Sequence, residues 1–324
     1  MACPAKVAAV LSLLTGLAVS ATTVNGSALQ QKPTFRSSVD VVTVAAVVRD
    51  RHGHFASDLT KKDFVIEESG LPRPIVEFHS EENAPLRVAL LFDVSGSMRL
   101  SAHMDEARHA AEQVLGTLNL GGDQAAVFSF DMNLQELQPF TSDAGAIESA
   151  LSRVMPYGET SLYDAIAETA HEVADTADRR RRRAIVVFTD GIDTSSELTP
   201  TRVSEIASAI DVPVYVVAVV APTEYEDQTA GRHTPLPAGT LRDLAHWTGG
   251  ELFVTSAPAH QSLAARQIVD ELRHEYVLAF NASDARGWHP VDVKVKDRSL
   301  TVRARTGYDV APGDRRGMSP MVDR

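Results

Sequence analysis

Asp93-Val94-Ser95-Gly96-Ser97 is the stretch that decides the interpretation of this sequence. It follows an apolar run, 86–92, which predicts a strand buried on both faces of a parallel sheet. The residues after it, 98–118, have the spacing of a helix. The stretch is therefore expected in the turn between the carboxyl end of a strand and the amino end of a helix. Open α/β sheets bind ligands at such turns.

The side chains of this turn predict a site for a hard cation. Asp93, Ser95 and Ser97 place a carboxylate and hydroxyls at alternate positions of a tight loop, so that they can converge on one point. Oxygen ligands of this kind suit a hard divalent ion and not zinc or copper.

Residues 84–274 alternate strands with helices around this turn. The strand-like runs share an apolar composition and are separated by stretches of helical spacing: 86–92, 124–130, 184–189, 212–220 and 251–255. The alternation predicts the α/β class, with a doubly wound and mostly parallel sheet. The weaker run 134–140 is expected to be an antiparallel edge strand.

Short β segments flank this region, 35–82 before it and 275–310 after it. Each segment is too small to bury a core alone. We therefore expect the two to pair as a smaller β-sandwich, with the α/β domain of 84–274 inserted between them. Residues 29–34 are expected to be a linker, and 311–324 a disordered tail.

The amino terminus, residues 1–28, has the features of a secretory signal peptide. Lys6 supplies a positive charge, and the apolar stretch 7–19 is too short to span a bilayer well. An uncleaved anchor or a buried helix is the alternative. We expect a secreted or periplasmic protein without a membrane span after cleavage. Because Cys3 is the only cysteine, the mature chain would contain no disulfide.

The overall composition is that of an ordinary globular protein. Hydrophobic residues make up 44% of the chain, enough to form a core. The net charge of -12 argues against nucleic acid and anionic membrane surfaces as main partners. The sequence leaves the oligomeric state open.

Two further loops are expected at the same edge of the sheet. One ends at Thr160 just before a helix, and the other begins at Asp190, directly after the strand 184–189. Each site residue also has a structural interpretation. Ser97 and Thr160 would cap helices, and Asp93 and Asp190 would brace their turns. The occurrence of all these residues at one sheet edge favours a functional site.

Three motifs together resemble the metal-ion-dependent adhesion site (MIDAS) of the von Willebrand factor type A (VWA) domain. They are Asp-Val-Ser-Gly-Ser-Met, Gly-Glu-Thr-Ser-Leu-Tyr-Asp-Ala and Phe-Thr-Asp-Gly. The resemblance covers residues 86 to about 274. The whole chain, with its amino-terminal β segment and a Tyr-x-Leu…Arg-x-Gly-Tyr tail, looks like the secreted VWA-related proteins of acidobacteria. Within the second motif, Asp164 is expected to be a helix-start charge or an outer support of the site.

The resemblance implies a role for each site residue. The hydroxyls of Ser95, Ser97 and Thr160 would bind Mg²⁺, Mn²⁺ or Ca²⁺ directly, and Asp93 and Asp190 would act largely through water. Neutral ligands leave the ion residual positive charge and an open position, which an Asp or Glu carboxylate of a partner protein can fill. The implied function is cation-dependent protein binding by an adhesion or scaffold module, not catalysis.

The alternative function is a secreted metal-dependent enzyme of hydrolase type. An aspartate after a strand suggests phosphoryl transfer of the Asp-x-Asp kind, but position 95 is Ser. The sequence contains no Gly-x-Ser-x-Gly elbow, Walker loop or Gly-x-Gly-x-x-Gly motif. We therefore do not expect an enzyme.

Overall fold

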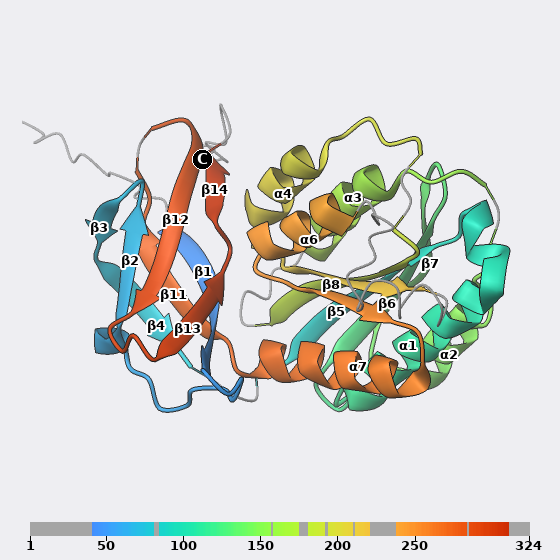
Figure 1. Cartoon of the computed structure of the whole chain (residues 1–324), viewed down its shortest axis with the longest axis horizontal. Helices are drawn as coiled ribbons and strands as arrows, with labels where there is room; N and C mark the ends of the chain where they lie inside the picture. Colours follow the sequence, from blue (N-terminus) through green and yellow to red (C-terminus); the bar gives the residue numbers. More distant parts are fainter. Residues whose placement is uncertain are drawn as a thin grey trace, which may run out of the picture. The chain divides into compact units, whose positions relative to one another are not determined.

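The computed structural model of the 324-residue chain describes residues 41–80, 84–156, 158–174, 181–191, 194–209, 211–220, 238–283 and 285–310. The expected signal peptide, linker and carboxyl-terminal tail lie outside these residues. Figure 1 shows one sheet that is covered by helices and a second group of strands from the same chain. Across the described ranges, no helix has the length and apolar character needed to cross a membrane.

The central six-stranded sheet has the strand order β10-β9-β8-β5-β6-β7. Its strands in chain order are β5 (Leu86–Asp93), β6 (Gln124–Phe130), β7 (Leu134–Thr141), β8 (Arg182–Thr189), β9 (Val214–Val219) and β10 (Leu252–Thr255). Neighbouring strands are parallel, except that β7 runs antiparallel to β6 at the edge. The predicted α/β class, with its mostly parallel sheet, is therefore confirmed.

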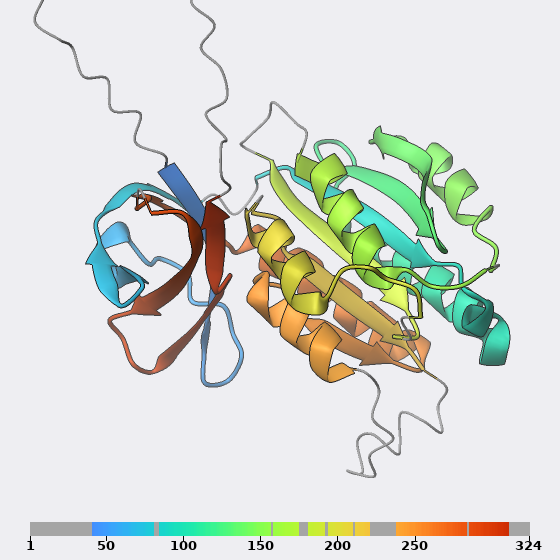
Figure 2. The same ribbon diagram turned by 90° about the horizontal axis from the view of Figure 1, so that it is seen from above.

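Helices cover both faces of this sheet (Figures 1 and 2). The side chains of β5 alternate between two cores, with Leu90 and Phe92 in one and Ala89 and Leu91 in the other. This alternation explains why the whole strand is apolar. The first core also contains α1 (His103–Thr117), α2 (Ala144–Leu151) and α7 (Pro258–Arg273), and the second contains α3 (Leu162–Ala174), α4 (Pro200–Ala209) and α6 (Ala238–Trp247).

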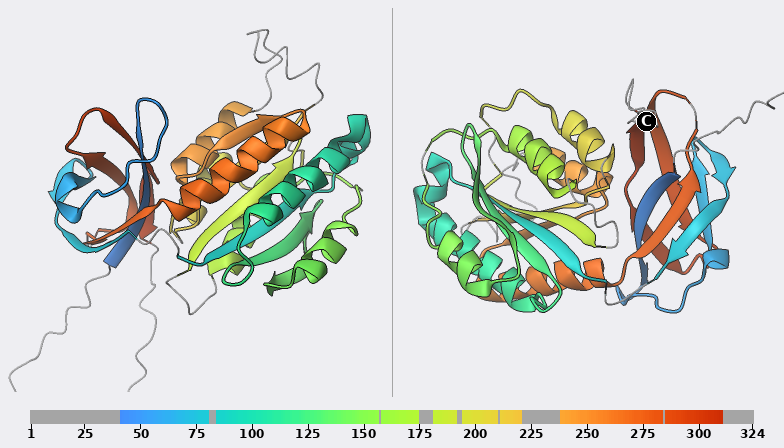
Figure 3. Two further views of the ribbon diagram at one scale, coloured as in Figure 1. Left: turned by 90° about the horizontal axis from the view of Figure 1, so that it is seen from below. Right: turned by 180° about the vertical axis from the view of Figure 1, so that it is seen from behind.

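The flanking segments form two four-stranded antiparallel sheets, β13-β1-β11-β4 and β14-β12-β2-β3 (Figure 3). Strands from before and after the α/β domain pair directly, since β1 contacts β11 and β13, and β2 contacts β12. The two sheets share one core, with Val44 and Phe280 from the first and Ile66 and Val293 from the second. The elements are β1 (Val41–Asp50), η1 (Lys61–Asp63), β2 (Phe64–Glu68), β3 (Leu71–Arg73), β4 (Ile75–His79), β11 (Tyr276–Asn281), β12 (Gly287–Val295), β13 (Leu300–Ala304) and β14 (Gly307–Val310).

The turn after β5 differs from the prediction. The chain forms a 3₁₀ helix, η2 (Gly96–Ala102), and α1 begins only at His103. Met98 is fully buried, and its N–H donates to the Ser95 carbonyl at 3.2 Å, which is the i+3 spacing of a 3₁₀ turn. The predicted helix start at position 98 is wrong for this reason. Ser97 lies inside the tighter turn, so it is not the cap of α1.

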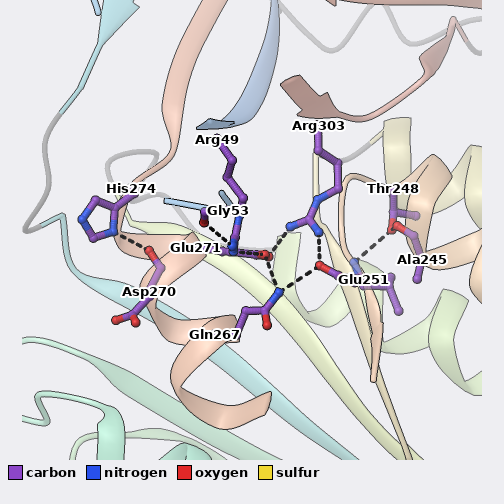
Figure 4. A network of polar contacts seen from close by, with 11 residues as sticks. Arg49, Gly53, Ala245, Thr248, Glu251, Gln267, Asp270, Glu271, His274 and Arg303 are labelled. Carbon is purple, nitrogen blue, oxygen red and sulfur yellow. Dashed lines mark hydrogen bonds and ion pairs between the residues drawn. The ribbon is translucent and has the colours of Figure 1, made fainter. Parts of the chain in front are cut away.

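A buried ion-pair network joins the β-sandwich to helix α7 (Figure 4). The Glu271 carboxylate has no exposed surface and accepts from Arg49 Nη2 of β1 at 2.7 Å. Arg303 of β13 pairs with both Glu271 and Glu251. Gln267 Nε2 donates to Glu251 at 3.3 Å and to Glu271 at 3.4 Å. The carboxylates of Glu251 and Glu271 are thus neutralised by arginines of β1 and β13.

Two fragments of the chain are expected to differ when they are made separately. Residues 84–274 alone should fold, because both of their cores are self-contained. Residues 35–82 alone should not, because β1 and β2 lose the partners β11, β13 and β12. Circular dichroism melts of the two fragments test this expectation. A cooperative transition from the shorter fragment would contradict it.

Candidate functional site

The candidate site begins at the carboxyl end of β5, where Asp93 is fully buried. One oxygen of its carboxylate, Oδ1, accepts from the Ser95 N–H at 2.8 Å. The other, Oδ2, accepts from Thr189 Oγ1 at 2.6 Å, and Thr189 ends the neighbouring strand β8. The carboxylate is therefore held at a fixed position between two parallel strands.

The two serine hydroxyls of the same turn lie close together. Ser95 Oγ and Ser97 Oγ are 3.0 Å apart. Ser95 is buried and Ser97 is half-buried, so this pair lies at the surface end of the turn. The 3₁₀ turn brings the alternate residues together.

The loop that contains Thr160 packs against this turn. The Gly158 carbonyl accepts from the Gly96 N–H at 2.9 Å. The Thr160 backbone is fixed on its other side by Thr194, whose Oγ1 accepts from the Thr160 N–H at 3.1 Å and whose N–H donates to the Thr160 carbonyl at 3.0 Å. Thr160 itself is buried. Its loop is therefore held against the turn after β5 on one side and against Thr194 on the other.

Gly158 is required by the packing of this loop. Its φ of +110° is a conformation that favours glycine, and a Cβ at this position would lie 2.9 Å from Cβ of Asp131. The Asp131 carbonyl in turn accepts from the Ser161 N–H at 2.8 Å. The loop after β6 is therefore a direct neighbour of the Thr160 loop.

Asp190 follows β8 directly and is buried. Burial and the nearby negative charge of Asp190 raise the pKa of Asp93 to about 6, against the hydrogen bonds from Ser95 and Thr189. Two buried carboxylates thus repel each other at the sheet edge. A divalent cation relieves such repulsion.

The donor set fits a hard divalent cation. The residues present supply carboxylate and hydroxyl oxygens without sulfur or imidazole. In the described ranges, no group of three or more His, Cys, Asp or Glu is placed to hold a metal ion. A metal at this edge would therefore depend on the serine and threonine hydroxyls as well as on the carboxylates.

Two supporting residues were not predicted from the sequence. Thr189 fixes the Asp93 carboxylate, and Thr194 fixes the Thr160 backbone. The sequence contains no local signal for Thr189, because this residue lies beside Asp93 through the register that pairs Phe92 of β5 with Phe188 of β8.

Asp164 lies outside the predicted ligand set and fixes a neighbouring segment of the backbone. Its carboxylate accepts from the Glu197 N–H at 2.9 Å and from the Leu198 N–H at 2.8 Å. Asp164 therefore ties the segment that follows the Asp190 loop to the start of α3.

Cation binding is expected to weaken as the pH falls through about 6. The pKa of Asp93 is raised, so in the metal-free folded chain this group holds a proton at lower pH, and a cation must displace it. Without metal, the stability of the folded chain changes with pH in the opposite direction: it decreases as the pH rises. The contribution of Asp93 to stability is fully present below its ordinary pKa of about 3.8 and is lost as the pH rises through about 6.

Thermal melts with Mg²⁺ or EDTA over about pH 4 to 8 would measure both effects. Asp93→Asn, which cannot titrate, is the control and should remove both dependences. A Mg²⁺-induced shift in Tm that is equal at every pH would contradict the expectation.

Comparison with known proteins agrees with this geometry. The von Willebrand factor type A domain family matches residues 88–192, which include all five predicted ligands. Thrombospondin-related anonymous protein of Plasmodium falciparum is 32% identical over 130 residues, covering 36% of this chain and 23% of that protein. The chain thus spans less than a quarter of the curated relative that it matches.

Two solved structures are also similar. A von Willebrand factor type A protein from Catenulispora acidiphila has 14% identity and a TM-score of 0.49, covering 85% of this chain and 76% of that one. Proximal thread matrix protein 1 from the mussel byssus, with a zinc-occupied MIDAS motif, has 16% identity and a TM-score of 0.47, covering 63% and 49%. The match to the von Willebrand factor type A domain family thus covers the part of the chain that contains most of β5 and all of β6, β7 and β8.

Proposed function

We propose that the chain is a secreted or periplasmic module that binds a partner protein through a divalent cation. Ser95, Ser97 and Thr160 would hold Mg²⁺, or Mn²⁺ or Ca²⁺, through their hydroxyls, with Asp93 and Asp190 behind them. An Asp or Glu carboxylate of the partner would complete the coordination. This function agrees with the resemblance of the whole chain to secreted VWA-related proteins of acidobacteria.

One observation carries the proposal. Two hydroxyls, those of Ser95 and Ser97, lie 3.0 Å apart next to a buried carboxylate that a second carboxylate repels. Without a cation this arrangement places like charges together with little to neutralise them. A bound cation would offset the repulsion between the two carboxylates. Because its hydroxyl ligands are neutral, the metal would still attract a carboxylate of a partner protein.

Cation-dependent capture is the experiment that tests this function. The full chain is immobilised and exposed to secreted proteins of its source in Mg²⁺, in Mn²⁺ and in EDTA. Partners should be retained with either cation, be released by EDTA and be absent from Asp93→Asn. Identical proteins bound in EDTA and by the variant would contradict the proposal.

A further inference from the structure

A single hydroxyl group links two of the three loops at the candidate metal site. Thr189 is the last residue of β8 and has no exposed surface. Its Oγ1 donates to Asp93 Oδ2, at the end of the neighbouring strand β5, at 2.6 Å. The same oxygen accepts from the N–H of Gly191, the residue after Asp190, at 3.0 Å. Thr189 therefore holds both the turn after β5 and the turn that bears Asp190.

The hydrogen bond from Thr189 to Asp93 continues toward the serine hydroxyls. Asp93 Oδ1 accepts from the Ser95 N–H at 2.8 Å, so the carboxylate also fixes the backbone of its own turn. In that turn, Ser95 Oγ and Ser97 Oγ lie 3.0 Å apart. Adjacent oxygens around an octahedral Mg²⁺ have about this separation, because each lies about 2.1 Å from the ion. A chain of hydrogen bonds that begins at Thr189 thus reaches a pair of hydroxyls with the spacing that Mg²⁺ requires.

The sheet itself does not depend on this hydroxyl. Strand β8 pairs with β5 and β9 through backbone hydrogen bonds. Both hydrogen bonds of Thr189 Oγ1 run instead to residues of the two acidic turns. Groups that orient metal ligands in this way typically change metal affinity when they are removed.

We propose that Thr189 is a positioning residue of the cation site, and that its hydroxyl sets the affinity for Mg²⁺ by fixing the two acidic turns relative to each other. Its proton is used by Asp93 and one of its lone pairs by Gly191, so Thr189 acts through these residues and not as a ligand. The inference rests on the proposed function for the presence of the cation. The hydrogen bonds that carry it can be tested without any metal.

Variants of the full chain separate this role from a general effect on stability. Thr189→Val removes the hydroxyl and keeps the branched shape, whereas Thr189→Ser keeps the hydroxyl and loses the methyl group. Thr169→Val is the matched control, because Thr169 is also fully buried and its Oγ1 donates to the Ala165 carbonyl at 2.7 Å. Thr169 lies about two turns from the start of α3. Thermal melts in EDTA show whether each variant folds, and Thr189→Ala replaces the valine variant if that variant does not fold.

Calorimetric titration measures the expected loss of affinity. Thr189→Val should bind Mg²⁺ about 10–100-fold more weakly than the wild type. Thr189→Ser should restore most of this affinity, and Thr169→Val should leave it unchanged. The affinity of Thr189→Val for Ca²⁺ should fall less than its affinity for Mg²⁺, because Ca²⁺ accepts irregular coordination and Mg²⁺ demands a near-ideal octahedron.

Amide hydrogen exchange in EDTA tests the same hydrogen bonds in the absence of metal. The Gly191 N–H loses its acceptor in Thr189→Val and should exchange faster than in the wild type. Its exchange should be unchanged in Thr189→Ser and in Thr169→Val.

The outcomes distinguish this inference from the proposed function. Equal Mg²⁺ affinities of the wild type and Thr189→Val, or a serine variant as weak as the valine variant, would overturn the positioning role and leave the proposed function intact. Equal losses for Mg²⁺ and Ca²⁺, or unchanged exchange of Gly191 in Thr189→Val, would also contradict it. If the wild type binds no Mg²⁺, the proposed function fails, and the role of Thr189 at a cation site fails with it.

Discussion

Replacing Glu271 by alanine is expected to lower the free energy of unfolding by about 3–5 kcal/mol. Its carboxylate has no exposed surface and is shared by Arg49 and Arg303 of the β-sandwich. Removing it leaves guanidinium groups that are only 26% and 18% exposed facing each other without their common anion. The cost is large because Arg49 loses its carboxylate partner and Arg303 loses one of its two.

Urea unfolding of the full chain followed by far-UV circular dichroism measures this loss. Glu112→Ala is the matched control, because Glu112 is a helical glutamate that is 54% exposed and pairs only at the surface with His109. It should change the free energy of unfolding by no more than about 0.5 kcal/mol. An equal, small effect of both variants would show that the network between the β-sandwich and α7 contributes little.

Replacing Asp93 by asparagine is expected to abolish stabilisation by Mg²⁺. For the wild type, a cation at about 100 times its dissociation constant adds about 2.7 kcal/mol to the free energy of unfolding. Asparagine keeps the shape of the side chain. Its oxygen can still accept from the Ser95 N–H, and its amide can donate to the Thr189 hydroxyl. The variant removes the charge that the cation needs while the turn keeps its hydrogen bonds.

Melts in Mg²⁺ and in EDTA separate the loss of metal binding from a loss of fold. In EDTA, Asp93→Asn should be at least as stable as the wild type near neutral pH, because the repulsion with Asp190 is gone. The control Asp105→Asn, whose side chain is 78% exposed on α1, should keep the full Mg²⁺-induced shift. A variant at Asp93 that still responds to Mg²⁺ would contradict the predicted ligand set.

The fold of the α/β domain could be predicted because its strands are apolar on both faces. Strands such as β5 and β8 contact one core on each face, so their sequences are mostly apolar at successive positions. The helices around them do not have this pattern. Short strands were missed for the opposite reason. Neither β3, with 3 residues, nor β14, with 4, is long enough to show an alternating pattern.

Most of the candidate site could be predicted, but not its supports. Asp93 and Asp190 stand at the carboxyl ends of the parallel strands β5 and β8, and Thr160 precedes α3, so the order of elements along the chain places all three at one edge of the sheet. The backbone bonds of Thr194 and the 3₁₀ turn at Ser97 depend on contacts between loops. Contacts between distant segments, such as Arg49 with Glu271, leave no local pattern in the sequence.

Calorimetric titration of the metal-stripped full chain with Mg²⁺ and Mn²⁺ tests the central claim most directly. We predict one ion bound per wild-type chain and none bound by Asp93→Asn or Asp190→Asn, with all three proteins folded. Binding of the same number of ions by the wild type and both variants, at the same affinity, would show that these carboxylates and their neighbouring hydroxyls do not form a metal site.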